Sequence, residues 1–337
     1  MKIYLILTAA MSLLMVLFPL AAVGFASDAK ESTTVVCEST AETNENETAQ
    51  TETTVQKAEE ETVKVLRVSS GKVMELQMYD YVVGAVASEI SPTYEKEAIK
   101  AQAVACYTYA KWLMQNADNA SLSGADISDS TQSHQGYYDS DELKEKWNDK
   151  YDTYITKIKE CVSEVFGQYM TYENEVILAC YHAVSPGQTE SAKNVWGKDI
   201  SYLKSVSAPG DKLSPDIDSE ATFSKEEFLK KAETLDGVFL ESDESKWLGK
   251  TKTTDTGFVS SLEIGGKTFD GNEIRTAFSL KSPYFTVKYE GGKFTFSVKG
   301  YGHGLGMSQY SADYMARQGS SYEEILLHFY SGVKIEK

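Results

Sequence analysis

The sequence predicts an α+β domain with a substrate cleft, preceded by a membrane-targeting segment and an acidic linker. Segments with helical periodicity and segments with strand alternation follow one another without the regular strand–helix–strand order of an α/β protein. The 337 residues are 42% hydrophobic and include 13 Phe and 21 Tyr. That content is enough for a sizeable core and too high for a mostly disordered protein.

The charge balance excludes one class of partner. The chain has 50 acidic residues against 33 Lys and Arg, a net charge of −17. A dedicated nucleic-acid binder would show a basic face, so we expect no nucleic-acid partner.

Residues 1–27 predict export. Lys2 is the single charge, and residues 3–27 have none. This apolar stretch exceeds the core of about 7–15 residues in a cleaved signal peptide and reaches the length of about 20 that a spanning helix needs. An uncleaved signal anchor with the domain outside the cell membrane is favoured. A cleaved signal peptide and a secreted protein stay open, because residues 24–26 (GFA) offer a cleavage site.

Residues 28–62 predict a disordered linker rich in Thr and Glu. They hold ten acidic residues and two lysines, without Gly, Pro or apolar periodicity. The folded domain is expected over residues 63–337. It contains three of the four cysteines, Cys106, Cys161 and Cys180. Because three cysteines cannot all pair with one another, we expect no disulfide framework. Cys106 is interpreted as a small, buried apolar residue.

The first half of the domain is expected to begin with a strand pair and continue with helices. Residues 63–77 alternate around a turn at 69–72. Asp80 can cap a short apolar helix at 81–88, and Pro92 ends it because proline restricts the residue before it. Further helices are predicted at 93–116, which is rich in alanine, and at 141–167, after a polar loop at 124–135.

The second half mixes short strands with three helices. Strands are expected at 170–172 and 176–183, which flank a turn at Glu173 and Asn174, and at 202–207, 257–264, 284–289 and 293–298. A helix over 224–235 begins with a capping box, Ser224 and Glu227. The last two helices are expected from Met307 and over 322–330.

Glu89 is the first candidate for catalysis. It ends an apolar helix just before a proline turn. The negative end of the helix dipole and partial burial would both raise the pKa of its carboxyl group. A carboxyl protonated near neutral pH can act as a general acid on a glycosidic oxygen. The alternative from the residues alone is a solvated glutamate at a helix end.

Residues 302–310 (GHGLGMSQY) and 181–190 (YHAVSPGQTE) are further candidates. Three alternating glycines allow a close backbone approach before a helix begins. They fit either a phosphate-binding loop or a tight turn that packs His303 and Gln309 under a groove. The aromatic, hydroxyl and lysine groups of 181–190 and 202–204 fit a polysaccharide groove, although strand aromatics also serve as core.

Together the three segments resemble the stage II sporulation protein D/amidase-enhancer family. The resemblance rests on residues 81–92 (YVVGAVASEISP), 97–104 (EAIKAQAV) with Thr108 and Tyr109, and 302–310, in order, and on the terminal residues 325–330 (ILLHFY). It runs from residue 63 to residue 337.

The resemblance implies a lytic transglycosylase that cuts the glycan strands of peptidoglycan, after an amidase has removed the stem peptides, during engulfment in sporulation. It implies that Glu89 is the catalytic acid, that no cofactor is needed, and that membrane, glycan strands and a cell-wall amidase are the partners. The residues that match the family's substrate-binding positions are Tyr107, Tyr181, Ser185, Tyr202, Lys204 and Tyr310.

Two departures from the family pattern bear on function. Tyr107 stands where the family usually has an arginine of the active cleft. Some members hold zinc in a Cys…His-Cys cluster, but residues 128–137 here offer only His134, and a structural zinc site normally needs four ligands. We therefore expect no metal. His182, His303 and His328 lie far apart in the sequence and are interpreted as structural.

Two other function classes stay open. A non-catalytic, glycan-binding activator of an amidase fits the amidase-enhancer branch of the family, and a loss of catalysis through Tyr107 would favour it. A membrane-tethered scaffold would depend on residues 28–62 more than on Glu89.

Overall fold

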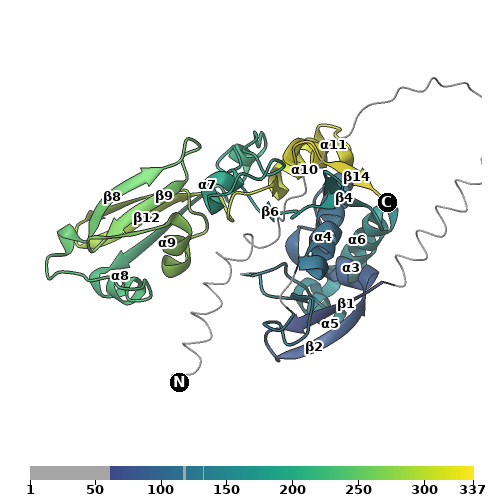
Figure 1. Ribbon diagram of the computed structural model, residues 1–337, viewed down its shortest axis with the longest axis horizontal. Helices are drawn as coiled ribbons and strands as arrows, with labels where there is room; N and C mark the ends of the chain where they lie inside the picture. The colour runs from purple at the N-terminus through teal and green to yellow at the C-terminus, as the bar shows by residue number, and fades with distance from the viewer. Residues whose placement is uncertain (1–60, 117–118, 132) are drawn as a thin grey trace, which may run out of the picture. The chain divides into compact units, whose positions relative to one another are not determined.

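The fold is a mixture of α-helices and small β-sheets, as predicted (Figure 1). The computed structural model describes residues 61–116, 119–131 and 133–337. The predicted anchor and nearly all of the predicted linker lie outside these residues, so both stay predictions, as do the domain boundaries. None of the helices within the described ranges is both long and apolar enough to cross a membrane.

The chain divides into two compact units. The first consists of the residues up to Tyr79 together with Leu113–Gly136. Its strands form a three-stranded sheet in the order β2-β1-β3. The strands are β1 (Thr62–Arg67), antiparallel to β2 (Lys72–Gln77), and β3 (Ile127–Ser128), parallel to β1. Side chains of Asp126 and Asp129 accept hydrogen bonds from the amides of Lys64 and Val68, at 2.9 and 2.8 Å.

The second unit consists of Asp80–Trp112 and Tyr137–Lys337. Its helices include α5 (Ser140–Trp147), the 3-10 helix η2 (Asn148–Lys150), α6 (Tyr151–Val165), α10 (Gln309–Arg317), α11 (Tyr322–Phe329) and most of α3 (Met78–Glu89) and α4 (Lys96–Asn116). The alanines on α4 are fully buried, which allows close helix packing because their side chains are small.

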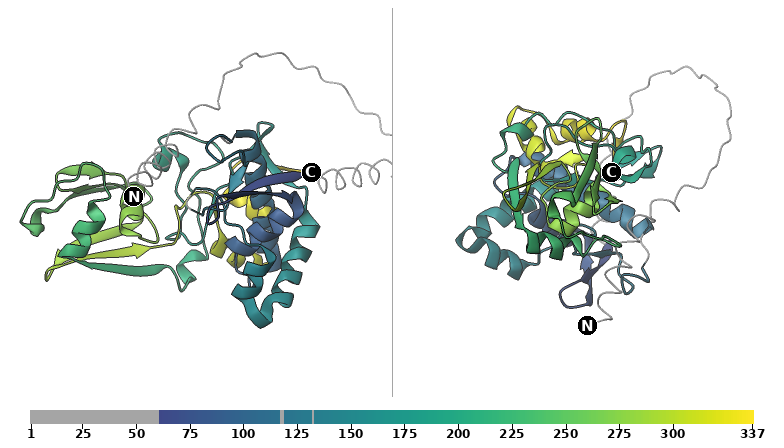
Figure 2. Two further views of the ribbon diagram at one scale, coloured as in Figure 1. Left: turned by 90° about the horizontal axis from the view of Figure 1, so that it is seen from below. Right: turned by 90° about the vertical axis from the view of Figure 1, so that its left-hand side faces the viewer.

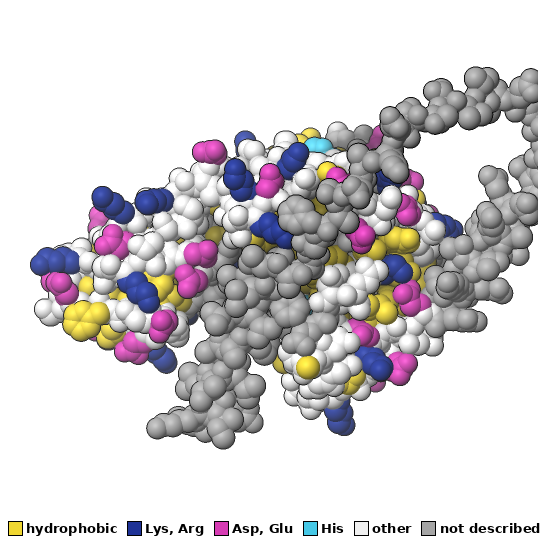
Figure 3. Space-filling model, in the orientation of Figure 1, with side chains coloured by type: hydrophobic (Ala, Val, Ile, Leu, Met, Phe, Trp, Pro, Cys, Tyr) yellow, Lys and Arg dark blue, Asp and Glu magenta, His cyan; other side chains and the backbone are white. Residues whose placement is uncertain are grey.

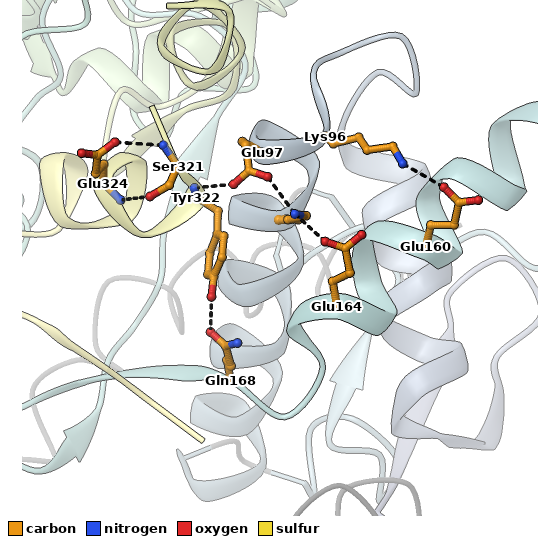
Figure 4. Close-up of polar contacts among 9 residues, drawn as sticks. Lys96, Glu97, Glu160, Glu164, Gln168, Ser321, Tyr322 and Glu324 are labelled. Atoms are coloured by element: carbon orange, nitrogen blue, oxygen red, sulfur yellow. Dashed lines mark hydrogen bonds and ion pairs between the residues drawn. The ribbon is translucent and has the colours of Figure 1, made fainter. Parts of the chain in front are cut away.

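Polar contacts tie α4 to α6 and α11 (Figure 4). The ammonium of Lys100 lies 2.7 Å from Glu97 on its own helix and 2.5 Å from Glu164 of α6. Glu97 also accepts the amide hydrogen of Tyr322, at 2.9 Å, and the hydroxyl of Tyr322 donates to Gln168. These bonds fix the helix that faces the candidate site.

Strands dominate residues 218–299 of the second unit. One antiparallel sheet has the order β11-β12-β7 and another has the order β10-β9-β8, and helices α8 and α9 pack on them (Figures 1 and 2). The elements are β7 (Asp218–Ser224), α8 (Lys225–Ala232), η4 (Glu244–Lys246), β8 (Leu248–Thr253), β9 (Val259–Ile264), β10 (Lys267–Phe269), α9 (Gly271–Phe278), β11 (Phe285–Glu290) and β12 (Lys293–Lys299).

This part has an aromatic core and a mixed-charge surface. Phe228 stacks on Phe294 with ring centroids 4.0 Å apart, and Trp247, Phe278 and Phe296 complete the cluster. On the face drawn in Figure 3, basic and acidic side chains are interspersed over these strands.

Short strands join segments that are far apart in the sequence. β6 (Tyr181–His182) pairs in parallel with β13 (Met307–Ser308), and Val184 bridges to Tyr301. β4 (Tyr169–Tyr172) pairs with β5 (Glu175–Val176) and with β14 (Lys334–Glu336). The remaining short elements are α7 (Ala192–Trp196) and η3 (Asp211–Leu213). The chain therefore leaves this region after Val184 and returns to the same place at Tyr301.

Most predicted elements are confirmed, whereas several predictions are wrong in detail. The helix before Glu89 begins at Met78, so Asp80 lies in its first turn instead of capping it. The helical region 141–167 is divided at Asn148, whose φ of 47° is left-handed. Residues 202–207 form no strand: the Thr189 hydroxyl takes the amide hydrogen of Val206, and only Ser207 makes an isolated bridge, to Gln188.

Candidate active site

Glu89 is the last residue of α3. The helix has a buried apolar face, which includes Val82, Val83 and Val86. The amide of Ile90 still bonds to the carbonyl of Val86, at 3.1 Å, and the chain then turns at Pro92. Glu89 itself is half-buried. The helix therefore places the carboxylate of Glu89 at its partly exposed C-terminal end, next to a buried apolar face.

Four side chains respond to the charge of Glu89, namely three phenol or thiol groups and the ammonium of Lys146. Burial lowers the pKa of Lys146, and the charge of Glu89 offsets part of that effect. Burial is the main cause that raises the pKa of Tyr181 well above its usual value, and Glu89 adds to it. Burial likewise raises the pKa of the Cys106 thiol to about 12 and that of Tyr109 further, again with a contribution from Glu89. The three phenol and thiol groups therefore stay neutral around this carboxylate, and a neutral phenol or thiol can donate a hydrogen bond.

A chain of buried side chains holds Tyr181. Gln309 donates to Gln102 at 3.2 Å, Gln102 donates to the sulfur of Cys106 at 3.3 Å, and Cys106 contacts the hydroxyl of Tyr181 at 3.7 Å. The chain links α10, α4 and β6. Gln102 and Cys106 were not expected to belong to the site. The signal that the sequence offers is Gln102 itself, an amide within the alanine-rich run at 98–105.

The glycine motif is a tight turn against the protein's own backbone. Gly302, Gly304 and Gly306 all have left-handed φ values, +115°, +83° and +67°. A Cβ atom at Gly306 would lie 1.9 Å from the carbonyl oxygen of Cys180, and one at Gly302 would lie 2.6 Å from Cβ of His182. The space next to these glycines is filled by the chain itself. The structure thus agrees with the tight-turn interpretation and not with a phosphate-binding loop.

His182 and His303 are neighbours, although they are far apart in the sequence. Their ring centroids are 5.9 Å apart. His182 Nδ1 lies 3.0 Å from the carbonyl of Leu305, so it carries the proton, and Nε2 has no hydrogen-bond partner among the described residues. His303 Nδ1 accepts the amide hydrogen of Leu305, at 3.0 Å. Burial lowers the pKa of both rings, that of His303 to about 3, so both support the glycine turn as neutral groups.

Ser185 belongs to the framework of this turn. Its amide donates to Asp211 Oδ2 at 2.6 Å, and Ser308 donates its hydroxyl to Asp211 Oδ1 at 2.7 Å. Ser185 Oγ accepts the amide hydrogen of Gly187. All three side chains, those of Ser185, Asp211 and Ser308, are buried. Asp211 therefore connects the segment after β6 to β13.

Tyr202 and Lys204 lie on the loop that runs beside Gln188 and Thr189. Tyr202 accepts the amide hydrogen of Leu178 on its hydroxyl, at 3.1 Å, and burial raises its pKa to about 12. Lys204 is exposed. The loop is held by hydrogen bonds to Thr189, including the 2.9 Å bond from Val206.

Tyr310 lies in the first turn of α10. Its hydroxyl donates to the carbonyl of Leu213 at 3.1 Å, and its ring meets the ring of Tyr94 edge-on, with centroids 6.3 Å apart. Tyr94 belongs to the turn that follows Glu89. Tyr310 is therefore connected to the end of α3 through one aromatic contact.

Comparisons with known proteins identify the family. The family model described as stage II sporulation protein, SpoIID, matches residues 67–172. Stage II sporulation protein D of Bacillus subtilis (strain 168) is 37% identical over 282 residues, which cover 83% of this chain and 80% of that protein. The chain belongs to the stage II sporulation protein D family. The protein of the same name from Bacillus amyloliquefaciens is 38% identical over 82% of this chain and 78% of its own length. The amidase enhancer of Bacillus subtilis (strain 168) is 28% identical over 75% of this chain and 40% of its own length.

Tyr107 differs from the other expected site residues of this SpoIID-family protein. Its side chain is 4% exposed and packs against Phe166, with ring centroids 5.6 Å apart. The ammonium of Lys111, one turn further along α4, lies 5.2 Å from its ring and 5.1 Å from that of Tyr169. A tyrosine here fills the core and holds a neighbouring cation.

Residues 128–137, where the sequence offers only His134 as a ligand, do not fit a metal site in this chain. His134 Nδ1 accepts hydrogen bonds from the amide and hydroxyl of Ser128, at 3.1 and 2.8 Å. Burial lowers the pKa of His134 to about 4. Within the described ranges, no three His, Cys, Asp or Glu side chains are grouped so that they could share a metal ion.

Proposed function

We propose that this protein is a lytic transglycosylase that cleaves the bond between MurNAc and GlcNAc in peptide-stripped peptidoglycan strands. Glu89 donates a proton to the glycosidic oxygen, and the bond from that oxygen to the anomeric carbon of MurNAc breaks. The 6-hydroxyl oxygen of the same MurNAc then bonds to the anomeric carbon, and the carboxylate of Glu89 takes the hydroxyl proton. The products are a 1,6-anhydro-MurNAc end and a new GlcNAc end.

One carboxylate is enough for this reaction. A glycoside hydrolase needs a second group to activate water or to form a covalent intermediate. Here the nucleophile belongs to the substrate, so one residue acts first as acid and then as base. The observation that carries the proposal is the position of Glu89, half-buried at the end of an apolar helix and within electrostatic range of Tyr181, Cys106 and Tyr109.

The substrate-binding part of the proposal uses Tyr181, Tyr202, Lys204 and Tyr310. Ser185, which is buried, would act through the turn that it holds. Lys204 is exposed, so its ammonium can meet the lactyl carboxylate of a MurNAc that has lost its peptide. Tyr181 and Tyr310 lie near the end of α3 and present aromatic surface for sugar rings.

We further propose that the protein acts at the outer side of a cell membrane. Residues 1–27 would anchor it there, and residues 28–62 would let the domain reach the wall. A cell-wall amidase would act first, and the setting would be engulfment during sporulation, in keeping with the family name.

The test is product analysis by mass spectrometry with the full chain in mild detergent. Peptide-free and peptide-bearing glycan strands are compared for the wild type and for Glu89→Gln, which keeps the shape but removes the acid. Glu226→Gln is the matched control, because Glu226 is an exposed carboxylate on α8 and lies outside the turn that follows Glu89. We expect 1,6-anhydro ends from the wild type and the control on peptide-free strands, and none from Glu89→Gln. Reducing ends without the anhydro bond would mean hydrolysis and would contradict the proposal.

A second candidate function is a non-catalytic activator of an amidase that binds glycan strands. The burial of Tyr107 at the position of a family arginine and the similarity to an amidase enhancer favour it. It predicts that neither the wild type nor Glu89→Gln cuts any strand, that both bind strands, and that both stimulate an amidase equally.

A further inference from the structure

The turn between α3 and α4, residues 91–95, is fixed by its own short contacts. The hydroxyls of Ser91 and Thr93 are 2.8 Å apart, and the amide of Tyr94 bonds to the carbonyl of Ser91 at 3.1 Å. The turn begins two residues after Glu89. Its position therefore sets where the end of α3, and the carboxylate on it, comes to lie.

One side of this turn is held by Lys157 of α6. Its ammonium donates to the carbonyl of Pro92 at 3.0 Å and to that of Tyr94 at 2.5 Å. A charged donor shared by two backbone carbonyls makes stronger bonds than a neutral donor would. Lys157 is half-buried, so water competes less for these bonds than at the open surface.

The other side is held by Asp313 of α10. Its carboxylate accepts the amide hydrogen of Glu95 at 2.7 Å and pairs with Arg317 one turn later. Asp313 is 1% exposed, although Arg317 is exposed. Tyr94 directly precedes Glu95 in the turn, and its ring contacts the ring of Tyr310. Burial and the charge of Asp313 raise the pKa of Tyr94 to about 12, so the phenol is neutral there.

We propose that Lys157 and Asp313 are positioning residues for Glu89, which hold the turn after it from two sides. This inference rests on the proposed function, because it assigns Glu89 as the acid. Neither residue is expected to touch the substrate. Each acts through the backbone of residues 92–95, and the contact between Tyr94 and Tyr310 means that the same turn also positions a proposed substrate-binding residue.

The reasoning predicts a specific loss. Without Lys157 two carbonyls of the turn lose their charged donor, and without the carboxylate of Asp313 the Glu95 amide loses its acceptor. The turn then adopts more than one conformation. The carboxyl group of Glu89 is oriented for proton transfer in only a fraction of the molecules. A displacement of about 1 Å at a catalytic group can cost on the order of 100-fold in rate. Binding of the strand, which depends on other side chains, should change little.

The experiment uses the full chain in mild detergent and defined peptide-free glycan oligomers. Lys157→Met removes the charged donor, and Lys157→Arg is the conservative variant that restores it. Asp313→Ala removes the acceptor, and Asp313→Asn keeps an acceptor oxygen without the charge. Lys96→Met is the matched control, because the ammonium of Lys96, like that of Lys157, makes a polar contact of α6, here an exposed pair with Glu160 at 3.0 Å (Figure 4). Turnover, KM and amide hydrogen exchange of residues 88–97 are measured for each variant.

We expect kcat to fall about 10- to 100-fold in Lys157→Met and Asp313→Ala, with KM within about threefold of the wild type. Lys157→Arg and Asp313→Asn should recover most of the loss, and Lys96→Met should behave as wild type. Exchange at the Glu95 amide should become at least about tenfold faster in the first two variants only.

Two results would overturn the inference. One is wild-type kcat in Lys157→Met and Asp313→Ala. The other is unchanged exchange of residues 88–97 in both variants. If the wild type itself makes no anhydro ends, the proposed reaction has failed. The exchange measurement then still decides whether Lys157 and Asp313 hold the turn.

Discussion

Replacing Gly306 by alanine should be among the most damaging single changes in the candidate site. The new Cβ would lie 1.9 Å from the carbonyl oxygen of Cys180, whereas real Cβ atoms hardly ever come within 3.0 Å of another heavy atom. The two must therefore separate by about 1 Å. That oxygen accepts two hydrogen bonds, from the amide of Met307 at 3.1 Å and from the hydroxyl of Tyr330 at 2.6 Å.

The magnitude follows from two contributions. A left-handed φ of +67° costs a residue with a Cβ about 1–2 kcal/mol. Weakening two hydrogen bonds costs about 1 kcal/mol each. The sum is about 3–4 kcal/mol, which corresponds to a fall of roughly 10 °C in the unfolding midpoint of a chain of this size.

Gly197 provides the control. Its φ is +70°, nearly the same, but no atom lies within 4 Å of the Cβ that an alanine would add. Gly197→Ala should therefore lose only the backbone contribution, roughly 4 °C. Thermal unfolding followed by circular dichroism compares the two variants with the wild type. Equal losses in Gly306→Ala and Gly197→Ala would refute the reasoning, because they would show that the close approach to Cys180 is relieved without cost.

Three further predictions address pH dependence, the core and substrate binding. The folded-state pKa of His303, about 3, is lower than the usual 6.5, so its contribution to stability is complete above about pH 6.5 and is lost as the pH falls toward 3. At pH 5 the loss relative to pH 8 should be about 2 kcal/mol, and urea unfolding of His303→Gln should show a correspondingly flatter pH dependence. Phe228→Ala should lose about 3–5 kcal/mol in the same assay, because the ring is fully buried, whereas Leu229→Ala, at a residue that is 38% exposed, should lose less than about 1 kcal/mol. Lys204→Met should raise KM for peptide-free strands about tenfold with little change in kcat. Lys193→Met, at another exposed lysine, should leave KM unchanged. A KM that is unchanged by the loss of Lys204 would exclude this lysine from the proposed binding site.

Features set by neighbouring residues could be predicted from the sequence. The helix that ends at Glu89 is marked by its apolar spacing and by Pro92, and both signals are local. The capping box of Ser224 and Glu227 is present as expected. The turn at Glu173 and Asn174 is confirmed too, since both residues have left-handed φ values.

Features that depend on distant residues could not be predicted. Residues 176–183 alternate like one strand, but the structure has two short strands there, because β6 pairs with β13 instead of continuing β5. The neighbourhood of His182 and His303 has the same origin. Lys157 and Asp313 are ordinary charged residues on their own helices, and only the fold brings them to the turn after Glu89.

The pairing of β6 with β13 has a consequence for the order in which the site can form. Tyr181 lies opposite Met307, which follows 126 positions later, and Gln309 completes the side-chain chain that ends at Tyr181. Contacts between residues so far apart in the sequence form slowly. The entropic cost of closing a long loop must be met before these contacts contribute any stabilising free energy. During synthesis Glu89 therefore emerges early and the residues that surround it emerge late. A growing chain carries the acid long before it carries a finished site, and any fragment that stops before Met307 lacks the partner strand of Tyr181.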